Sequence, residues 1–216
     1  ASTFDALGGA ASGGTSALVF LLAPALYGSR DVAHLAWLGD CRAVLCHNGA
    51  PRVLTSDHLV RRESERRRIL GEGGIVHANR LSGFLEVSRA LGDLDHDTGF
   101  KPAGLSAQPE MVHVPITSLD EFLIVGSDGL WDVMSEADAV RLAREELRVY
   151  GDASMASEKL VEAALKRHTD DNVTAIVVSL NPTNDSESVT VPRRPRLFNK
   201  KTSNSLGDVG RPLSDS

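Results

Sequence analysis

The sequence has little cysteine and no long apolar run. Cys41 and Cys46 are the only cysteines among 216 residues, too few for a disulfide framework or for the ligand set of a structural zinc site. The most apolar stretch, residues 17–26, is about half as long as a membrane-spanning helix and contains Pro24. No basic segment precedes it, as a signal peptide would require. We therefore expect no membrane partner and a location in the cytoplasm, the nucleus or both.

The sequence also lacks an excess of basic residues. Lys and Arg total 23 against 29 Asp and Glu, for a formal net charge of -6. Binding to nucleic acid or to an acidic membrane draws on a basic surface, so neither partner is expected. The arginine-rich run at residues 61–68 also contains glutamates, and the mixed signs favour a solvated helix face over a nucleic-acid site.

The pattern of apolar residues predicts an α+β fold. Strands are expected at residues 15–22, 32–38, 43–46, 51–54, 111–114, 122–126 and 173–180, and helices at 60–70 and 154–167. A further helix is expected to open at the capping box of residues 135–138 and to end before Gly151. Asn48-Gly49 is a strong hairpin signal, and the first four strands are expected to form an antiparallel meander. Strands first and helices last, with hairpin connections, favour antiparallel sheets covered by helices over a doubly wound parallel sheet.

A change of composition divides the chain into a domain and a tail. Beyond Asn181, Pro, Ser, Thr, Asn and Arg replace the large apolar residues, and such a segment cannot bury enough apolar surface to offset the entropy of ordering. We expect one domain at residues 1–180 and a disordered tail at residues 181–216.

Three aspartates stand where buried strands are expected to begin or end. Asp128 and Asp132 follow the apolar run at residues 122–125, and Asp171 precedes the run at residues 173–178. A hard divalent cation such as Mg²⁺ or Mn²⁺ prefers carboxylate oxygens held on rigid elements. The alternative is that each aspartate caps a turn or a helix, because Asp-Gly and Asp-Asn are ordinary turn sequences.

Seven segments follow one another in the order and spacing of the metal-dependent serine/threonine phosphatases of type 2C, which the chain resembles from about residue 12 to residue 180. They are Ser12-Gly13-Gly14-Thr15-Ser16, Gly39-Asp40-Cys41-Arg42-Ala43-Val44, Leu54-Thr55-Ser56-Asp57-His58, Gly73-Gly74, residues 83–93, residues 127–133, and Asp171-Asn172-Val173-Thr174. One such segment alone would be weak evidence, but the ordered set is specific.

The resemblance implies a fold and a reaction. The fold would be an α-β-β-α sandwich, with two packed antiparallel sheets flanked by helices and a metal centre at one end between the sheets. Two Mg²⁺ or Mn²⁺ ions would activate a water that hydrolyses phosphoserine or phosphothreonine without a phosphoenzyme. Phosphoprotein substrates in signalling and a monomeric state are implied as well.

The resemblance also implies roles for particular residues. Asp128 and Asp171 would be direct metal ligands, and no catalytic residue is expected beyond the ligands. Asp57 and Asp132 would serve a further, weaker metal site or its surroundings, the alternative being a surface or helix-capping role. Gly129 and Asn172 would fix the turns rather than touch the metal.

His58, beside Asp57, is expected at the surface or near the site rather than as a ligand. Cys41 and Cys46 are expected to serve packing rather than redox regulation.

The chain departs from the family at its front. The family's earlier Glu-Asp pair, its Asp-Gly-His-Gly-Gly motif and a phosphate-binding arginine have no counterpart before Ser12, so the front portion of the catalytic domain is expected to be missing. The chain would then be a fragment or isoform of an enzyme, a truncated phosphatase-like binding module without catalysis, or one half of a domain assembled from two chains. Alone, it is expected to be at best feebly active and poorly stable.

Overall fold

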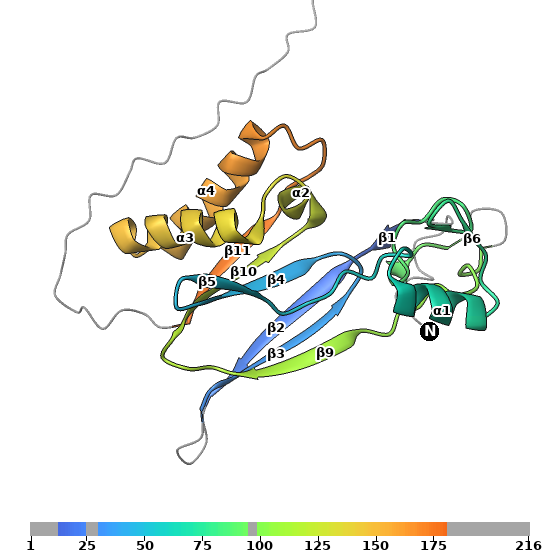
Figure 1. Cartoon of the computed structure of the whole chain (residues 1–216), viewed down its shortest axis with the longest axis horizontal. Helices are drawn as coiled ribbons and strands as arrows, with labels where there is room; N and C mark the ends of the chain where they lie inside the picture. The colour runs from blue at the N-terminus through green and yellow to red at the C-terminus, as the bar shows by residue number, and fades with distance from the viewer. Residues whose placement is uncertain (1–12, 25–29, 95–98, 181–216) are drawn as a thin grey trace, which may run out of the picture. The chain divides into compact units, whose positions relative to one another are not determined.

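The computed structural model of the chain describes residues 13–24, 30–94 and 99–180, so the predicted tail at 181–216 lies outside the described residues. The elements follow one another as shown in Figure 1: β1 (Gly14–Thr15), β2 (Ala17–Ala23), β3 (Val32–Leu38), β4 (Arg42–His47), β5 (Ala50–Val53), α1 (Glu63–Gly71), β6 (Val76–His77), β7 (Arg80–Leu81), β8 (Leu91–Gly92), β9 (Glu110–Pro115), β10 (Asp120–Gly126), α2 (Asp128–Trp131), α3 (Glu136–Tyr150), α4 (Ala153–Lys166) and β11 (Ala175–Ser179).

Two antiparallel sheets form the body of the described chain. One has the strand order β11-β10-β4-β5 and the other the order β2-β3-β9. Helices α3 and α4 lie against the first sheet (Figure 1). Two short ladders, β1-β8 and β6-β7, and three isolated bridges are added to these sheets among the described residues. The predicted α+β class, with antiparallel sheets and helices, is confirmed.

The predicted meander of four strands is wrong, because β3 and β4 belong to different sheets. The turn that starts at Gly39, whose φ is +88°, carries the chain from one sheet to the other. This arrangement brings Ala33 and Leu35 of β3 into one buried cluster with Ala43 and Leu45 of β4. Side-by-side pairing would leave one face of both strands without a partner, whereas stacking buries both sets of side chains.

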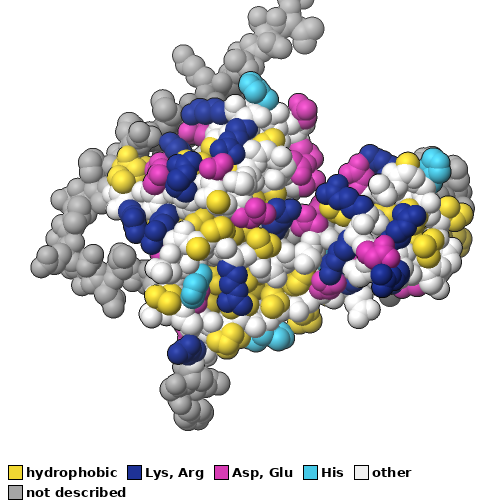
Figure 2. All heavy atoms as spheres, in the orientation of Figure 1, with side chains coloured by type: hydrophobic (Ala, Val, Ile, Leu, Met, Phe, Trp, Pro, Cys, Tyr) yellow, Lys and Arg dark blue, Asp and Glu magenta, His cyan; other side chains and the backbone are white. Residues whose placement is uncertain are grey.

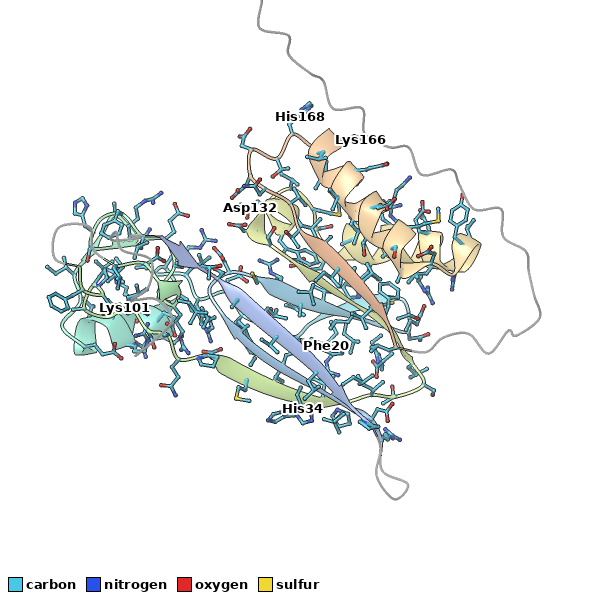
Figure 3. All side chains as sticks on the ribbon, turned by 180° about the vertical axis from the view of Figure 1, so that it is seen from behind. Phe20, His34, Lys101, Asp132, Lys166 and His168 are labelled. Carbon is cyan, nitrogen blue, oxygen red and sulfur yellow. The ribbon has the colours of Figure 1, made fainter. Side chains whose placement is uncertain are left out.

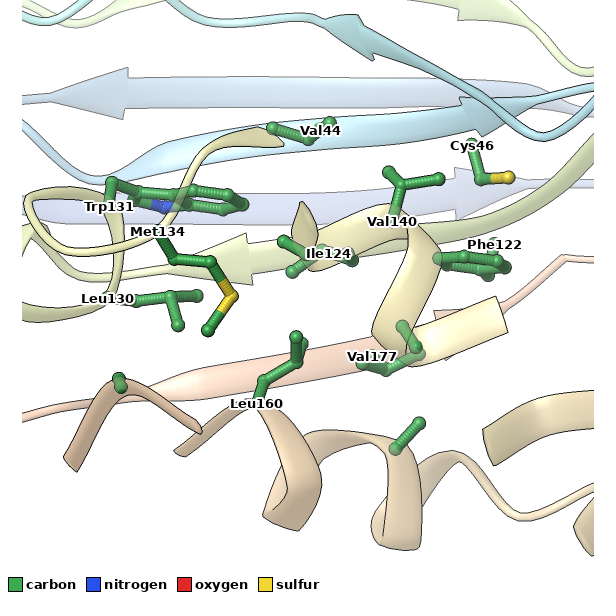
Figure 4. Close-up of a cluster of buried hydrophobic side chains, with 14 residues drawn as sticks. Val44, Cys46, Phe122, Ile124, Leu130, Trp131, Met134, Val140, Leu160 and Val177 are labelled. Carbon is green, nitrogen blue, oxygen red and sulfur yellow. The ribbon is translucent and has the colours of Figure 1, made fainter. Parts of the chain in front are cut away.

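The sheet of β11, β10, β4 and β5 is buried on both faces at its centre. Leu45 and Leu123 lie between the two sheets, whereas the neighbouring residues Val44 and Ile124 point under the helices (Figure 4). All four side chains are at most 1% exposed. Because successive side chains of a strand point to opposite faces, these two strands tie the inter-sheet core to the helical core.

The helices begin and end at residues that suit those positions. The hydroxyl of Ser135 accepts a hydrogen bond from the Asp138 N–H, as the predicted capping box requires, and α3 ends at Gly151, whose φ is 63°. The helix expected from residue 60 begins later, at Glu63, because the Val60 N–H is bonded to the Glu86 carbonyl. In the described part of the chain, no helix is both long and apolar enough to cross a membrane.

The outer face of the β2-β3-β9 sheet carries exposed apolar side chains. Val19 and Met111 flank Ala36 in one row of the register, and Val19, Leu21 and Met111 are each more than 60% exposed. Figure 3 shows this sheet from behind, with His34 labelled on it. Only three of the four layers of an α-β-β-α sandwich are therefore formed by the described residues.

Two leucines of α4 provide a matched test of the helical core. Leu160 is fully buried and Leu165 is 58% exposed. We expect Leu160→Ala to lower the free energy of unfolding by about 3 kcal/mol, because it leaves a cavity, and Leu165→Ala to change it by less than about 0.5 kcal/mol. Urea unfolding followed by circular dichroism measures both. Equal losses in the two variants would contradict the packing of α4.

Candidate metal centre

The end of β10 and the approach to β11 form one edge of the sheet. The strands pair antiparallel with Gly126 opposite Ala175, so the turn that leaves β10 and the loop that enters β11 are neighbours. The Ser127 N–H donates to the Thr174 carbonyl at 3.1 Å, and the Thr174 N–H donates to the Ser127 hydroxyl at 3.1 Å. Asp128 begins α2 directly after this bonded pair.

Gly129 and Asn172 bring the two turns together through their backbones. A Cβ atom on Gly129 would lie 2.5 Å from the Asn172 carbonyl oxygen and 3.4 Å from the Asp171 Cβ, so only glycine permits this approach. The Gly129 N–H donates to Asp128 Oδ1 at 2.8 Å, and the Asn172 N–H donates to Asp171 Oδ1 at 2.6 Å. The structure thus places Asp128 and Asp171 on adjoining turns; their role as ligands stays a prediction.

Asp40 enters the same edge from the turn between the sheets. β4 pairs with β10 so that Arg42 lies opposite Gly126, which places the residues just before β4 beside α2. The Ser16 hydroxyl donates to Asp40 Oδ1 at 2.7 Å. Asp40 was not among the expected site residues. The sequence shows Asp40 only as an aspartate in a turn between two strands. It could be predicted as a site residue only if the two strands were known to belong to different sheets.

Two carboxylates of this edge, Asp128 and Asp132, have raised pKa values. The pKa of Asp128 is raised by burial, then by the charge of Asp40, and further by Asp171, although the hydrogen bond from Gly129 opposes the shift. The pKa of Asp132 is raised by burial, then by Asp128. Acidic side chains gather near α2 in Figure 2, and Figure 3 labels Asp132 there. This end of the sheet, which carries Asp40, Asp128, Asp132 and Asp171 and is called the carboxylate edge below, therefore concentrates negative charge.

Asp57 differs from the other carboxylates because an arginine neutralises it. Arg42 Nη2 lies 2.7 Å from Asp57 Oδ2, and Arg42 Nη1 pairs with Glu136. The guanidinium carbon lies 5.7 Å from the centroid of the Trp131 ring, within the range of a cation–π contact. Within the described residues, by contrast, no ion pair joins a basic side chain to Asp40, Asp128, Asp132 or Asp171.

Asp40, Asp128 and Asp171 offer the kind of ligand atom that suits a hard divalent cation, although in the described part of the chain their oxygens do not all lie within 4.8 Å of one another. Their donor atoms are carboxylate oxygens, which Mg²⁺ and Mn²⁺ prefer, and a bound cation would relieve a repulsion that the described side chains leave uncompensated. Cys41 stands beside them, but burial, then the charges of Asp40 and Asp128, raises the pKa of its thiol to about 11. Its sulfur therefore stays protonated near neutral pH and is a poor ligand and nucleophile.

A second group, distinct from this edge, also brings possible ligand atoms together. One atom from each of His58, Glu65 and Glu110 lies within 4.8 Å of the others. However, Glu65 accepts from Arg89 at 2.6 Å and from Arg68 at 2.9 Å, and Arg89 also pairs with Glu110. These guanidinium groups already compensate the carboxylates and would repel a cation, so we assign this group to structural ion pairing.

Two expectations for this region are only partly right. His58 is fully buried rather than at the surface, and its ring stacks on Trp37 with centroids 6.0 Å apart. Burial, then the charge of Arg89, lowers its pKa, which favours the neutral ring. The helix face at residues 61–68 is not wholly solvated either, because Glu65 is only 2% exposed. Its partner Arg89 is distant in sequence, which hid the pair from local charge patterns.

Comparison with known sequences gives a family match. The Protein phosphatase 2C family pattern matches residues 3–173. Probable protein phosphatase 2C 22 of Arabidopsis thaliana is 44% identical over 183 residues, covering 82% of this chain and 45% of that protein. Probable protein phosphatase 2C 54 of Oryza sativa subsp. japonica is 43% identical over 152 residues, or 68% and 42% of the two chains. The chain spans less than half the length of these relatives.

Solved structures share the fold. The serine-threonine phosphatase 2C of Toxoplasma gondii matches with a TM-score of 0.63 and 30% identity, over 77% of this chain and 58% of that one. A C. elegans sex determining protein matches with a TM-score of 0.61 and 32% identity, over 70% and 37% of the two chains.

The contact at Gly129 can be tested against another helical glycine. Gly129→Ala should lower the free energy of unfolding by about 1–3 kcal/mol, because the new methyl group must push the two turns apart. Gly71→Ala, in α1, meets nothing within 4 Å and should be neutral or stabilising by up to about 1 kcal/mol. Thermal unfolding of both variants gives the comparison. A fully stable Gly129→Ala variant would show that the turns are not in contact.

Acid should weaken the Glu65 network in a defined pH window. Burial raises the pKa of Glu65, but hydrogen bonds from Arg89, Ser88 and Arg68 to the carboxylate outweigh it and lower the pKa from 4.5 to about 2. Since the folded-state pKa is depressed, the stabilisation is present above pH 4.5 and lost as the pH falls through about 2. The shift corresponds to about 3 kcal/mol at neutral pH, of which roughly 1 kcal/mol should remain at pH 3.

Urea unfolding of Glu65→Gln, compared with the unmodified chain at pH 7, 5 and 3, measures this contribution. The gap in unfolding free energy should narrow toward pH 3. Glu63→Gln is the control, because Glu63 is on the same helix but its side chain is 66% exposed, and its pair with Arg67 should contribute little. A gap that stays constant from pH 7 to pH 3 would contradict the assignment.

Proposed function

The chain belongs to the protein phosphatase 2C family, and from this membership we propose that it is a Mg²⁺- or Mn²⁺-dependent protein serine/threonine phosphatase. The observation that carries the proposal is the carboxylate edge, where the turns that hold Asp40, Asp128 and Asp171 lie side by side and these side chains have no basic ion-pair partner among the described residues. Such an arrangement costs stability unless a cation binds. It is therefore typical of a functional site rather than of a structural one.

The residues of the chain would position the reaction rather than take part in it covalently. When bound, the metal ions lower the pKa of water and stabilise attacking and departing oxygens of a phosphate ester. Asp128 and Asp171 would hold them, with Asp40 as a further carboxylate, on turns fixed by the backbone contact at Gly129. A cysteine-based reaction is disfavoured, because the Cys41 thiol has its pKa raised to about 11.

The remaining parts of the proposal concern the setting of the enzyme. We propose phosphoproteins as substrates and a monomer in the cytoplasm or the nucleus. Residues 1–180 would form the phosphatase-like domain and residues 181–216 a tail. Asp132, whose pKa is raised by burial and then by Asp128, would help to attract a metal ion when its carboxylate is ionised.

A second candidate is a phosphatase-like binding module that lacks catalysis. It is favoured by the share of the relatives that the chain covers, 45% of the Arabidopsis thaliana protein. Such a module would keep the fold and a weak cation site but not the turnover. Turnover and cation binding therefore have to be measured separately.

The proposed activity is tested with a phosphothreonine peptide. The chain should release phosphate with Mn²⁺, at a low rate because it is expected to be at best feebly active alone, and the release should stop in excess EDTA. Asp128→Asn should lower the turnover by more than about 100-fold, because loss of even the groups around a ligand typically costs about 10- to 100-fold. Asp170→Asn, next to the predicted ligand Asp171 but without a resolved role, should leave turnover within about twofold.

The outcomes separate the two candidates. Turnover that persists in EDTA would contradict a metal-dependent phosphatase. A folded chain that binds Mn²⁺ but releases no phosphate would be the binding module.

A further inference from the structure

We propose that His34 and His113 form a binding site for a divalent metal ion that prefers imidazole ligands, Zn²⁺ or Cu²⁺, on the outer face of the β2-β3-β9 sheet. The site is separate from the carboxylate edge and does not depend on the proposed phosphatase activity. The two histidines are 79 residues apart in the sequence. A bound metal would therefore fasten the edge strand β9 to the central strand β3.

The register of β3 and β9 places the two side chains directly opposite each other. His34 pairs with His113 in the antiparallel ladder, and three pairs away the Ile116 N–H donates to the Asp31 carbonyl at 2.7 Å. Hydrogen-bonded and non-hydrogen-bonded pairs alternate along such a ladder, so the histidines form a non-hydrogen-bonded pair. Side chains of this kind of pair lie closer together.

The imidazole rings of His34 and His113 converge through their Nδ1 atoms. These atoms lie 2.7 Å apart, and the ring centroids are 4.7 Å apart with the ring planes at 65°. In neutral rings one Nδ1 carries the proton that the other accepts, so one proton lies between two nitrogens. A metal ion can replace this proton and accept a lone pair from each ring. The displaced proton moves through water to Nε2 of its own ring, and both rings stay neutral.

The distance between the two nitrogens suits a chelate. Metal–nitrogen bonds of about 2.0–2.1 Å place two neighbouring nitrogens about 2.9 Å apart at a right angle and about 3.3 Å apart at a tetrahedral angle. Starting from 2.7 Å, the rings need only a small separation for the tetragonal geometry of Cu²⁺ and a larger one for tetrahedral Zn²⁺. His34 is partly exposed and His113 is exposed, so water can fill the remaining coordination positions.

The neighbouring strand positions on this face are apolar. In the row of the histidines, β2 contributes Leu21. The rows two residues away share the face of the histidines, and they hold Val19, Ala36, Met111, Ala23, Val32 and Pro115. None of these side chains competes for the rings or repels a cation. The pair differs in this respect from the His58 group, whose carboxylates are compensated by guanidinium groups.

Calorimetric titration with Zn²⁺ in excess Mg²⁺ tests the site, because Mg²⁺ prefers carboxylate oxygens and leaves imidazole free. His34→Gln and His113→Gln should each weaken Zn²⁺ binding about 100-fold, since the second ring then no longer binds from the same surface. His77→Gln is the matched control. His77 is exposed and lies in the β6-β7 ladder, so its loss should change the affinity by less than about twofold.

Two measurements on the unmodified chain do not depend on how the variants fold. One equivalent of Cu²⁺ should give an electron paramagnetic resonance spectrum with splitting from two directly bound nitrogen atoms. Zn²⁺ at about 100 times its Kd should raise the Tm by about 5–10 °C, because it binds the folded chain. This rise should be absent in His113→Gln and preserved in His77→Gln.

Three results would overturn the inference. They are an unchanged Zn²⁺ affinity in both His34→Gln and His113→Gln, an equal loss of affinity in His77→Gln, and a Cu²⁺ spectrum without two bound nitrogens. Asp128→Asn should leave Zn²⁺ binding in excess Mg²⁺ unchanged. The failure of this inference would therefore leave the proposed function standing, since Mn²⁺-dependent turnover is assigned to the carboxylate edge.

Discussion

The candidate site depends on the pairing of one central strand. β10 pairs antiparallel with β4 on one side and with β11 on the other, so that Gly126 lies beside both Arg42 and Ala175. The turns that follow or precede these positions must then meet at one edge. A slip of one residue would exchange the two faces of the strand and bury Leu123 and Ile124 in the wrong cores. The apolar pattern of β10 sets the register of its pairing with β4 and β11, and this register determines where the turns that carry the carboxylates lie.

The carboxylate edge lowers the stability of the fold, because its negative side chains repel one another and have no basic ion-pair partner among the described residues. Elsewhere the described acidic side chains are often compensated, as Glu65 is by Arg89 and Arg68, or as Glu121 is by Arg144 at 2.7 Å. Asp40 and Asp128 are not, and burial makes their repulsion stronger. Natural proteins accept such conflicts where a ligand resolves them. The contrast within one chain is stronger support for a cation site than the acidic residues alone.

Local signals predicted the elements well and their partners poorly. Residues 32–38 form the predicted strand with the same bounds. The helix predicted between the capping box at Ser135 and Gly151 is formed as well, because alternation, caps and a terminal glycine are local. The split between β3 and β4 was not predictable, since a period of two does not say which strand lies alongside. The buried positions of His58 and Glu65 depend on Trp37 and Arg89, which only tertiary folding brings near. The short helix α2 was missed for its length.

His58 also connects the two-sheet sandwich with the segment that carries α1. The backbone N–H of His58 donates to the Gly39 carbonyl at 2.9 Å, and its ring stacks on Trp37. Its backbone carbonyl accepts a hydrogen bond from the Ser88 N–H at 2.7 Å. The other neighbour of Asp57, Ser56, accepts a hydrogen bond from Trp37. Asp57 is thus clamped on both flanks to the end of β3. If the segment that carries α1 moved, the contacts of His58 with Trp37 and Gly39 would be strained first. The Asp57 carboxylate would keep its position next to the two sheets.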